Sequence, residues 1–147
     1  MWRNVSRMKR GFGAEYDFCP TTYILPEDYQ RFAVDRDNYP IWIMKPNALS
    51  CGRGIKLIGR KTVVDRLNNY VISKYILYPH LINGFKYDLR LYVVVTGFDP
   101  LKIYLYREGL VRFATETYSV APCSLKKRYM HLTNYSVNKN SIYFQEA

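Results

Sequence analysis

The clearest pattern of apolar and polar positions lies in residues 84–112 and predicts a strand. From Lys86 to Val95 the residues alternate between two sides. One side is aliphatic and aromatic: Tyr87, Leu89, Leu91, Val93 and Val95. The other side begins with charges of mixed sign: Lys86, Asp88, Arg90, then Tyr92 and Val94. Because side chains spaced by two residues project from one face, Lys86, Asp88 and Arg90 are expected to lie side by side.

The local sequence leaves two interpretations of this charged side open. It is either the solvated face of a half-buried strand or the floor of a binding site. In the second interpretation the face offers a lysine for phosphate, a carboxylate and a fixed guanidinium. Arginine suits a planar anion because its forked N–H donors can bind two oxygens at once.

Two further strands are predicted in the same region. A glycine and an Asp-Pro pair mark a turn over residues 96–100, and Glu108–Gly109 marks another. Between and after these turns, residues 101–106 and 110–114 are expected to form strands. Three consecutive strands joined by short turns predict an antiparallel meander.

The rest of the chain is predicted to mix short helices with short strands. Helices are expected at residues 2–12, from Pro26 through Ala33, and at residues 62–70. Extended segments are expected at residues 18–25, 41–45, 55–58 and 71–76. The predicted class is therefore α+β, with a mostly antiparallel sheet and flanking helices.

Two loops have compositions that allow a functional interpretation. Residues 46–54 carry glycines, which let backbone amides approach an anion closely, as in a flap over phosphates. The loop is not a Walker loop, because it lacks the GKS/T ending and is followed by a strand. By itself the G-x-G hairpin is interpreted as an ordinary turn. Residues 130–139, dense in Asn, Ser and Thr, are likewise interpreted as a capped turn.

Composition narrows the class of protein. A chain of 147 residues is one domain or part of one, and 48% hydrophobic residues argue against disorder. No apolar run approaches the roughly 18 residues needed to span a membrane. The basic N-terminus is not followed by an apolar stretch, so no secretory signal is predicted. Three widely spaced cysteines without a CxxC pair indicate reduced thiols, not a disulfide framework or zinc site.

The charge balance indicates an anionic partner. The net charge is +10, which attracts nucleic acid, anionic lipid or an acidic protein segment. Lys126, Lys127, Arg128 and Lys139 form a candidate basic patch. The 15 tyrosines could stack on bases, but no RNA-binding motif accompanies them and most occupy strand-like positions. Nucleic acid is therefore not the expected partner.

A series of longer motifs resembles the tubulin–tyrosine ligase-like family, and its tubulin polyglutamylase members most. In order, the motifs are WRNVSRM, TTYILPEDY, IWIMKP, SCGRGI, SKYI, LINGFKYDLRLYVVVT, DPLKIYLYREGLVRFAT and HLTNYSVNK. The resemblance covers nearly the whole chain. It implies a partial catalytic domain with an ATP-grasp-like fold. A lead-in segment is expected over roughly residues 1–40 and nucleotide-binding lobes over roughly residues 41–147.

The resemblance also implies an activity. Family members use ATP and Mg²⁺ to activate a carboxylate as an acyl phosphate, which an amino-acid amine then attacks. In the glutamylases the acceptor is a glutamate side chain of the acidic tubulin C-terminal tail, and the added amino acid is L-glutamate. Tubulin and microtubules are the implied partners. The implied setting is the cytoplasm and cytoskeleton, including the axoneme of cilia or flagella and the basal body.

The family's nucleotide-site roles transfer to matching positions. Lys45 and Lys86 are expected to provide cations to the phosphates, beneath the loop at Cys51 and Gly52. The adenine is expected to meet the backbone of the SKYI segment, which comprises Ser73, Lys74, Tyr75 and Ile76. Asp88, Thr133 and Asn134 match further nucleotide-site positions.

The catalytic and substrate roles transfer in the same way. Arg90, together with Lys86, is expected to stabilise charge on the acyl phosphate or transition state. Arg112 matches a position that binds the carboxylate of the incoming amino acid. Ser136 and Lys139 are expected near the same substrate.

Two departures from the family pattern affect these expectations. Cys51 stands where family members often carry arginine, which removes a cation from the phosphate loop, and Arg53 is a candidate replacement. The family's magnesium ligands are expected beyond residue 147, and Glu146 is not expected to replace them. The chain is therefore expected to be a ligase fragment that is inactive alone. The alternatives are a non-catalytic tubulin- or nucleotide-binding module, a pseudoenzyme, or a family ligase that uses glycine or tyrosine.

Overall fold

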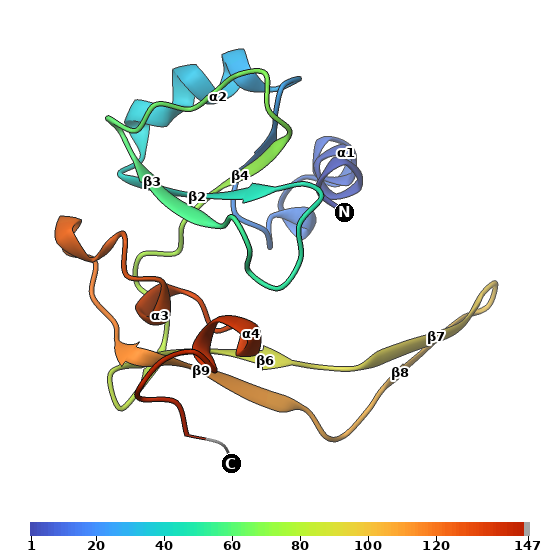
Figure 1. The fold of residues 1–147 in the computed structure, drawn as a ribbon. Coiled ribbons are helices and arrows are strands. Elements are labelled where there is room, and N and C mark those ends of the chain that lie inside the picture. Colours follow the sequence, from blue (N-terminus) through green and yellow to red (C-terminus); the bar gives the residue numbers. More distant parts are fainter. Residues whose placement is uncertain (146–147) are drawn as a thin grey trace. The chain divides into compact units, whose positions relative to one another are not determined.

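The computed structural model describes residues 1–145 and consists of small antiparallel sheets with a few short helices (Figure 1). Glu146, which is not expected to replace the magnesium ligands, lies outside the described residues. The chain divides into two compact units, Met1–Tyr78 and Pro79–Ala147. No described helix is both long enough and apolar enough to cross a membrane.

The first unit is built on a four-stranded sheet with the order β1-β4-β2-β3, in which every neighbouring pair is antiparallel. Its strands are β1 (Thr22–Ile24), β2 (Ile41–Pro46), β3 (Lys56–Gly59) and β4 (Tyr70–Lys74). Its helices are α1 (Trp2–Phe12), η1 (Gly13–Tyr16), α2 (Tyr29–Asp35) and η2 (Arg36–Asn38). The predicted strands at residues 41–45, 55–58 and 71–76 are confirmed to within about two residues at each end.

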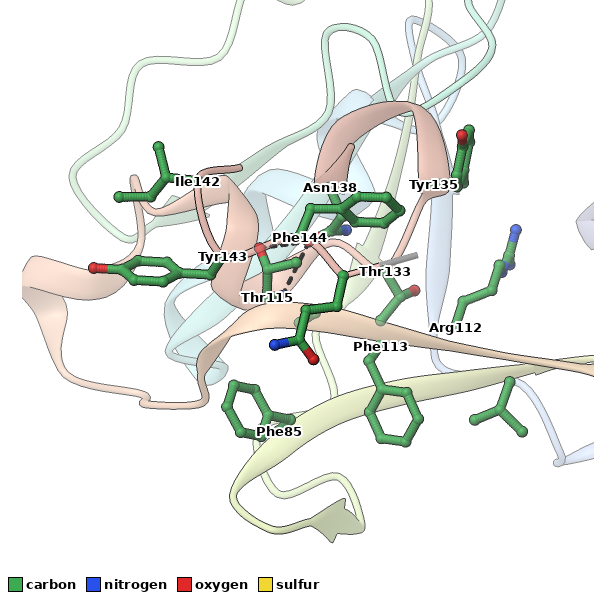
Figure 2. Close-up of a pocket in the computed structure, with 13 residues that line it drawn as sticks. Phe85, Arg112, Phe113, Thr115, Thr133, Tyr135, Asn138, Ile142, Tyr143 and Phe144 are labelled. Atoms are coloured by element: carbon green, nitrogen blue, oxygen red, sulfur yellow. Dashed lines mark hydrogen bonds between the residues drawn. The ribbon is translucent and has the colours of Figure 1, made fainter. Parts of the chain in front are cut away.

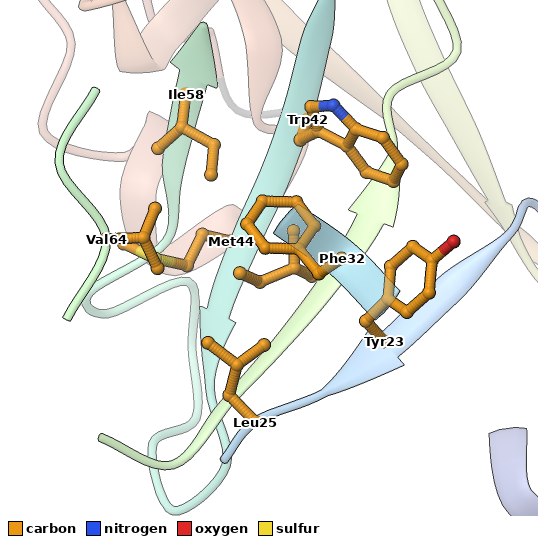
Figure 3. Close-up of a cluster of buried hydrophobic side chains, with 8 residues drawn as sticks. Tyr23, Leu25, Phe32, Trp42, Met44, Ile58 and Val64 are labelled. Atoms are coloured by element: carbon orange, nitrogen blue, oxygen red, sulfur yellow. The ribbon is translucent and has the colours of Figure 1, made fainter. Parts of the chain in front are cut away.

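An aromatic cluster forms the core of this unit (Figure 3). Trp42, on the central strand β2, is fully buried, and its ring contacts Tyr23, Phe32 and Tyr39 at centroid distances of 5.3–5.8 Å. Its indole Nε1 donates to the Arg36 carbonyl at 3.2 Å. The apolar run of β2 therefore anchors the sheet.

The helix predicted at residues 62–70 is wrong, because this segment is an irregular loop with a turn near residues 66–68, and Tyr70 begins β4. The Asp65 carboxylate accepts hydrogen bonds from the Leu67 backbone N–H at 2.9 Å and from the Asn68 side chain at 2.8 Å. Such local bonds compete with helical ones. Of the apolar residues at helical spacing, Val64 is buried, whereas Val63 and Leu67 are exposed.

The second unit is a long ribbon, with a three-stranded sheet β5-β6-β9 at its base, short helices packed on that base and a two-stranded extension β7-β8 (Figure 1). Its strands are β5 (Leu81–Ile82), β6 (Phe85–Arg90), β7 (Val93–Phe98), β8 (Leu101–Leu105) and β9 (Leu110–Thr117). Its helices are η3 (Pro122–Ser124), α3 (Arg128–His131) and α4 (Tyr135–Asn138). Residues 130–139 thus contain α4 and the end of α3.

The predicted meander is wrong in its strand order. β7 pairs with β8, but β9 pairs with β6, so the chain runs out along β6–β7 and returns along β8–β9. Glu108–Gly109 is therefore a break in the returning strand and not a reversal. A Cβ at Gly109 would lie 2.9 Å from the Arg90 carbonyl oxygen, so glycine permits the two strands to approach here.

The apolar side of the predicted strand is not buried within the described residues. Leu89, Leu91, Val93 and Val95 are each more than 40% exposed. Along β7 and β8 the apolar residues of both faces are exposed. The alternation of apolar and polar residues correctly predicted the extended conformation. Its implication that the apolar side packs against another part of the chain is wrong for the described residues.

Candidate active site

The charged face of β6 meets β9 and the segment before α4. Three predicted site residues are hydrogen-bonded to one another there, and a fourth is bonded to the same segment. Asp88 and Arg112 are directly opposite in the β6–β9 register. Arg112 Nε donates to Asp88 Oδ1 at 3.0 Å, and Arg112 Nη2 donates to Asp88 Oδ2. Thr133 donates a further side-chain hydrogen bond to Asp88. Lys86 Nζ donates to the backbone carbonyl of His131 at 2.9 Å.

The electrostatics of this group favour full ionisation. Burial by itself would raise the pKa of the Asp88 carboxyl, but hydrogen bonds from Arg112 and Thr133 and the charges of Arg112 and Arg90 lower that pKa below its usual range. The hydrogen bond to Asp88 raises the pKa of Arg112 against the opposing effect of its burial. Asp88 and Arg112 thus form a fixed ion pair, with Arg90 near enough to act on it.

A network around Asn138 holds the 130–139 segment against β9 (Figure 2). The buried Asn138 side chain accepts from the Thr115 backbone N–H and hydroxyl, each at 3.0 Å. Its amide donates to the Leu132 carbonyl at 2.7 Å and the Asn134 carbonyl at 3.1 Å. Because the carbonyls of Leu132 and Asn134 lie on either side of Thr133 in the chain, Asn138 fixes the position of the backbone from which Thr133 bonds to Asp88.

His131 forms a second buried contact in this unit. Its ring is almost fully buried, its Nε2 donates to the Ser124 carbonyl at 3.0 Å, and it packs edge-on against Tyr118. Burial lowers the pKa of His131, outweighing the hydrogen bond to Ser124, and the charge of Lys86 acts in the same direction as burial. The buried ring anchors His131, the residue whose backbone carbonyl accepts the hydrogen bond from Lys86.

An open pocket of about 890 Å³ lies beside these residues (Figure 2). Aromatic side chains dominate its lining, which includes Phe85, Phe113, Tyr135, Tyr143 and Phe144. Arg112 is the only charged residue among the described ones that line it, and Thr133 and Asn138 also contribute. The pocket therefore offers an apolar wall with one cation.

The first unit places another group of predicted residues around a smaller pocket of about 360 Å³. Lys45, Cys51, Gly52 and Arg53 all line it. Cys51 and Gly52 have φ values of 60° and 74°, so the loop turns through a left-handed conformation that is rare for cysteine. Lys45, Cys51 and Arg53 are exposed, which leaves two cations beside the glycine-bearing loop.

The SKYI segment is held firmly within the same unit. Ser73 Oγ shares a hydrogen bond of 2.8 Å with Thr22 Oγ1, and Lys74 Nζ lies 5.3 Å from the Tyr39 ring centroid. The Tyr75 backbone N–H donates to the Ile41 carbonyl at 3.1 Å, and its carbonyl accepts from Tyr39 Oη at 2.7 Å. Ile76 follows as an exposed side chain.

The remaining predicted residues surround α4. Asn134 is the residue before α4, and its side chain makes no capping hydrogen bond. Ser136 lies in α4, and Lys139 Nζ lies 5.9 Å from the Tyr135 ring centroid. Within residues 1–145, no cluster of three His, Cys, Asp or Glu side chains could hold a metal ion.

Sequence reasoning missed Asn138, Thr115 and the aromatic wall of the pocket. The only local signal for Asn138 is its position four residues after Asn134, which places both on one face of a helical turn. Its partner Thr115 is 23 residues away in the sequence, so only the folded chain brings them together.

Comparison with known proteins identifies relatives along the whole chain. The chain is 45% identical over 148 residues to the tubulin monoglutamylase TTLL4 of Mus musculus, covering 99% of this chain and 12% of that protein. It is 45% identical over 144 residues to the tubulin polyglutamylase TTLL5 of Homo sapiens, covering 96% and 11%. A probable beta-tubulin polyglutamylase of Tetrahymena thermophila is 43% identical over 148 residues, covering 97% and 12%.

The chain thus spans about an eighth of the length of these relatives. The model of the tubulin-tyrosine ligase family matches residues 1–147. The resemblance inferred from the motifs is therefore confirmed. This chain belongs to the tubulin-tyrosine ligase family.

Proposed function

We propose that this chain contributes to an ATP-dependent ligase that adds L-glutamate to glutamate side chains of tubulin C-terminal tails. The observation that carries the proposal is the group Lys86, Asp88, Arg112 and Thr133 at the base of the ribbon, in a chain whose relatives are named tubulin glutamylases. Such a group supplies fixed positive charge beside a pocket. An acyl-phosphate reaction needs this, because phosphoryl transfer depends on positioning and charge stabilisation.

Within this proposal the fold is ATP-grasp-like. Residues 1–40 form the lead-in, and residues 41–147 belong to the nucleotide-binding lobes. Lys45 and the loop at Cys51–Gly52 contact the phosphates, with Lys86 as a second phosphate cation. The SKYI segment meets the adenine, and Asn134 and Thr133 lie at the nucleotide. Mg²⁺ accompanies ATP, but the described residues do not fit a metal site, and none of them is assigned to it.

In the proposed reaction the ATP γ-phosphoryl group passes to the carboxylate of a tubulin glutamate, and ADP leaves. The amine of free glutamate then attacks the acyl phosphate, which forms an amide and releases phosphate. Arg90 and Lys86 stabilise the charge on the transferring group. Arg112 binds the carboxylate of the incoming glutamate, with Ser136 and Lys139 near that substrate.

The acidic tubulin tail is the proposed macromolecular partner. The chain carries 22 Lys and Arg residues against 12 Asp and Glu residues, so it attracts an acidic peptide. This attraction mainly accelerates the encounter and weakens with salt. The proposed setting is microtubules in the cytoplasm, with the cilium as a more specific location.

The test is transfer of labelled glutamate to tubulin by the complete protein. We expect incorporation that requires ATP and disappears when the acidic tails are removed by protease. Glycine and tyrosine are tested in parallel, and incorporation of either one instead of glutamate would refute the glutamate assignment. Salt-sensitive binding to tubulin without any transfer would instead indicate a binding module.

Two substitutions connect the activity to the charged face of β6. Lys86→Ala and Arg90→Ala should each abolish transfer while circular dichroism stays unchanged. Lys102→Ala is the matched control, because Lys102 is an exposed cation on β8 of the same ribbon. Near wild-type turnover in either test variant would exclude this face from the active site.

A further inference from the structure

The ion pair between Asp88 and Arg112 uses one particular edge of the guanidinium. The two bonds come from Nε and Nη2, so Asp88 contacts the side edge of the arginine fork. A guanidinium has five N–H donors, and this contact uses two of them. The three donors on Nη1 and the outer side of Nη2 form a second edge that can bind another carboxylate with two hydrogen bonds.

The surroundings of Arg112 favour an anion at that second edge. Arg112 lines the pocket of about 890 Å³ and is the only charged residue among its described lining. Asp88 neutralises one positive charge, but Arg90 also acts on Asp88, so the group keeps a net positive charge. The pair is only partly exposed, at 27% for the Arg112 side chain and 33% for that of Asp88, so solvent screens it incompletely.

The carboxylate of Asp88 is committed to these contacts. Oδ1 accepts from Nε, Oδ2 accepts from Nη2, and the Thr133 hydroxyl adds a third hydrogen bond. Thr133 is itself held in place because Asn138 bonds the carbonyls on either side of it, at Leu132 and Asn134. A carboxylate constrained in this way fixes the orientation of the arginine facing it.

We propose that Asp88 is a positioning residue for amino-acid binding. It orients Arg112 so that the outer edge of the guanidinium receives the carboxylate of the incoming amino acid, and Thr133 and Asn138 hold Asp88 in place. The inference rests on the proposed ligase function. It differs from the role that the family resemblance gave Asp88, since a nucleotide ligand would affect ATP binding and not glutamate binding.

The test is steady-state kinetics of the complete protein with Asp88→Asn, varying glutamate and ATP separately. The amide keeps the shape of Asp88 but loses its charge and replaces one acceptor with a donor. We expect the KM for glutamate to rise about 10- to 100-fold, the range expected for losing a charge-assisted hydrogen bond, with the KM for ATP unchanged within about 3-fold. Asp88→Glu, which keeps the charge, should restore part of the loss.

Thr133→Val and Glu108→Gln complete the set. Thr133→Val replaces the hydroxyl with a methyl group and should raise the KM for glutamate by about 3- to 10-fold, which tests the inference even where Asp88→Asn fails to fold. Because Thr133 is also proposed to lie at the nucleotide, only the KM for glutamate of this variant tests the inference. Glu108→Gln makes the same charge change as Asp88→Asn at an exposed site between β8 and β9, and both KM values should stay at wild type. If turnover is lost, equilibrium binding of labelled glutamate and of a non-hydrolysable ATP analogue replaces the KM values.

Three results separate the inference from the function on which it rests. A raised KM for ATP with an unchanged KM for glutamate would make Asp88 a nucleotide ligand and overturn the inference. Unchanged values for both substrates would also overturn it. If the wild-type protein transfers no glutamate to tubulin, the proposed function itself fails, independently of how the variants behave.

Discussion

Residues 1–78 and residues 79–145 are stabilised by different kinds of interaction. The first unit has an eight-residue buried cluster centred on Trp42, and Thr22 is the one buried polar side chain among its residues. In the described part of the second unit, Ser124, His131 and Asn138 are buried beside only four apolar residues. One unit is therefore held together by apolar packing, whereas the base of the other depends on satisfied polar contacts.

The comparison shows how each unit holds its candidate site residues. Apolar packing is non-directional, so the first unit positions its phosphate-loop candidates through the backbone of the sheet. Hydrogen bonds are directional, and a fully satisfied buried network specifies one arrangement. The second unit uses such a network to fix Thr133 and the carbonyl that holds Lys86, where side-chain geometry matters for chemistry.

The largest effect is expected from breaking the aromatic core. Trp42→Ala removes a fully buried ring and its contacts with Phe32 and Tyr23, so it should reduce the free energy of unfolding by about 3–5 kcal/mol. Denaturant unfolding followed by circular dichroism measures this change. Leu67→Ala, at a 78% exposed side chain, is the control and should change stability by less than about 0.5 kcal/mol. Equal losses of unfolding free energy in Trp42→Ala and Leu67→Ala would contradict the assignment of Trp42 to the core.

The polar network is tested by Asn138→Leu. Leucine has a similar volume but leaves the Thr115 N–H and the carbonyls of Leu132 and Asn134 without hydrogen-bond partners. This loss should reduce the free energy of unfolding by roughly 2–3 kcal/mol. The same unfolding measurement applies. Asn140→Leu is the matched control, because the Asn140 side chain makes one exposed hydrogen bond to the Ser136 carbonyl, and its loss should cost well under 1 kcal/mol. A neutral Asn138→Leu would mean that apolar packing holds this unit too.

A smaller effect is expected where the outgoing and returning strands of the ribbon approach each other at Gly109. Gly109→Ala places a Cβ 2.9 Å from the Arg90 carbonyl oxygen, a backbone atom that cannot simply rotate away. The substitution should cost about 1–2 kcal/mol by forcing the strands apart. Gly11→Ala is the opposite control, since a Cβ there meets nothing within 4 Å and alanine favours the helix by up to about 1 kcal/mol. A lower melting temperature for Gly109→Ala together with a higher one for Gly11→Ala would confirm the close approach of the strands at Gly109.

The smallest effect is a pH dependence that belongs to the second unit. Folding lowers the pKa of His131, so the folded state disfavours the protonated ring. The resulting stability is present above the unfolded pKa of about 6.5 and is lost as the pH falls through the lower folded value. His131→Gln should flatten the stability profile between about pH 7 and pH 5, whereas His80→Gln, at the other of the two histidines, should leave the slope in place.

The sequence predicted the local conformation of most elements well. The helix at residues 2–12 and the strands around Trp42 and Ile72 are confirmed, because apolar spacing reports directly on helix or strand geometry. The side-by-side placement of Lys86 and Asp88 on one strand is likewise consistent with β6. The helix at residues 62–70 failed because the Asp65 side chain forms local turn bonds that the spacing of apolar residues does not report.

The sequence by itself determined the family, the extended conformation of the strands after Gly84 and the charged residues that lie on β6. Only the tertiary structure decided that β9 returns to β6, that Asp88 pairs with Arg112 across 24 residues, and that Asn138 is buried while Val93 and Val95 are exposed. The physical reason is that alternation specifies which way a side chain points. What it meets there depends on which distant segment folds against it, and that choice is a property of the whole chain.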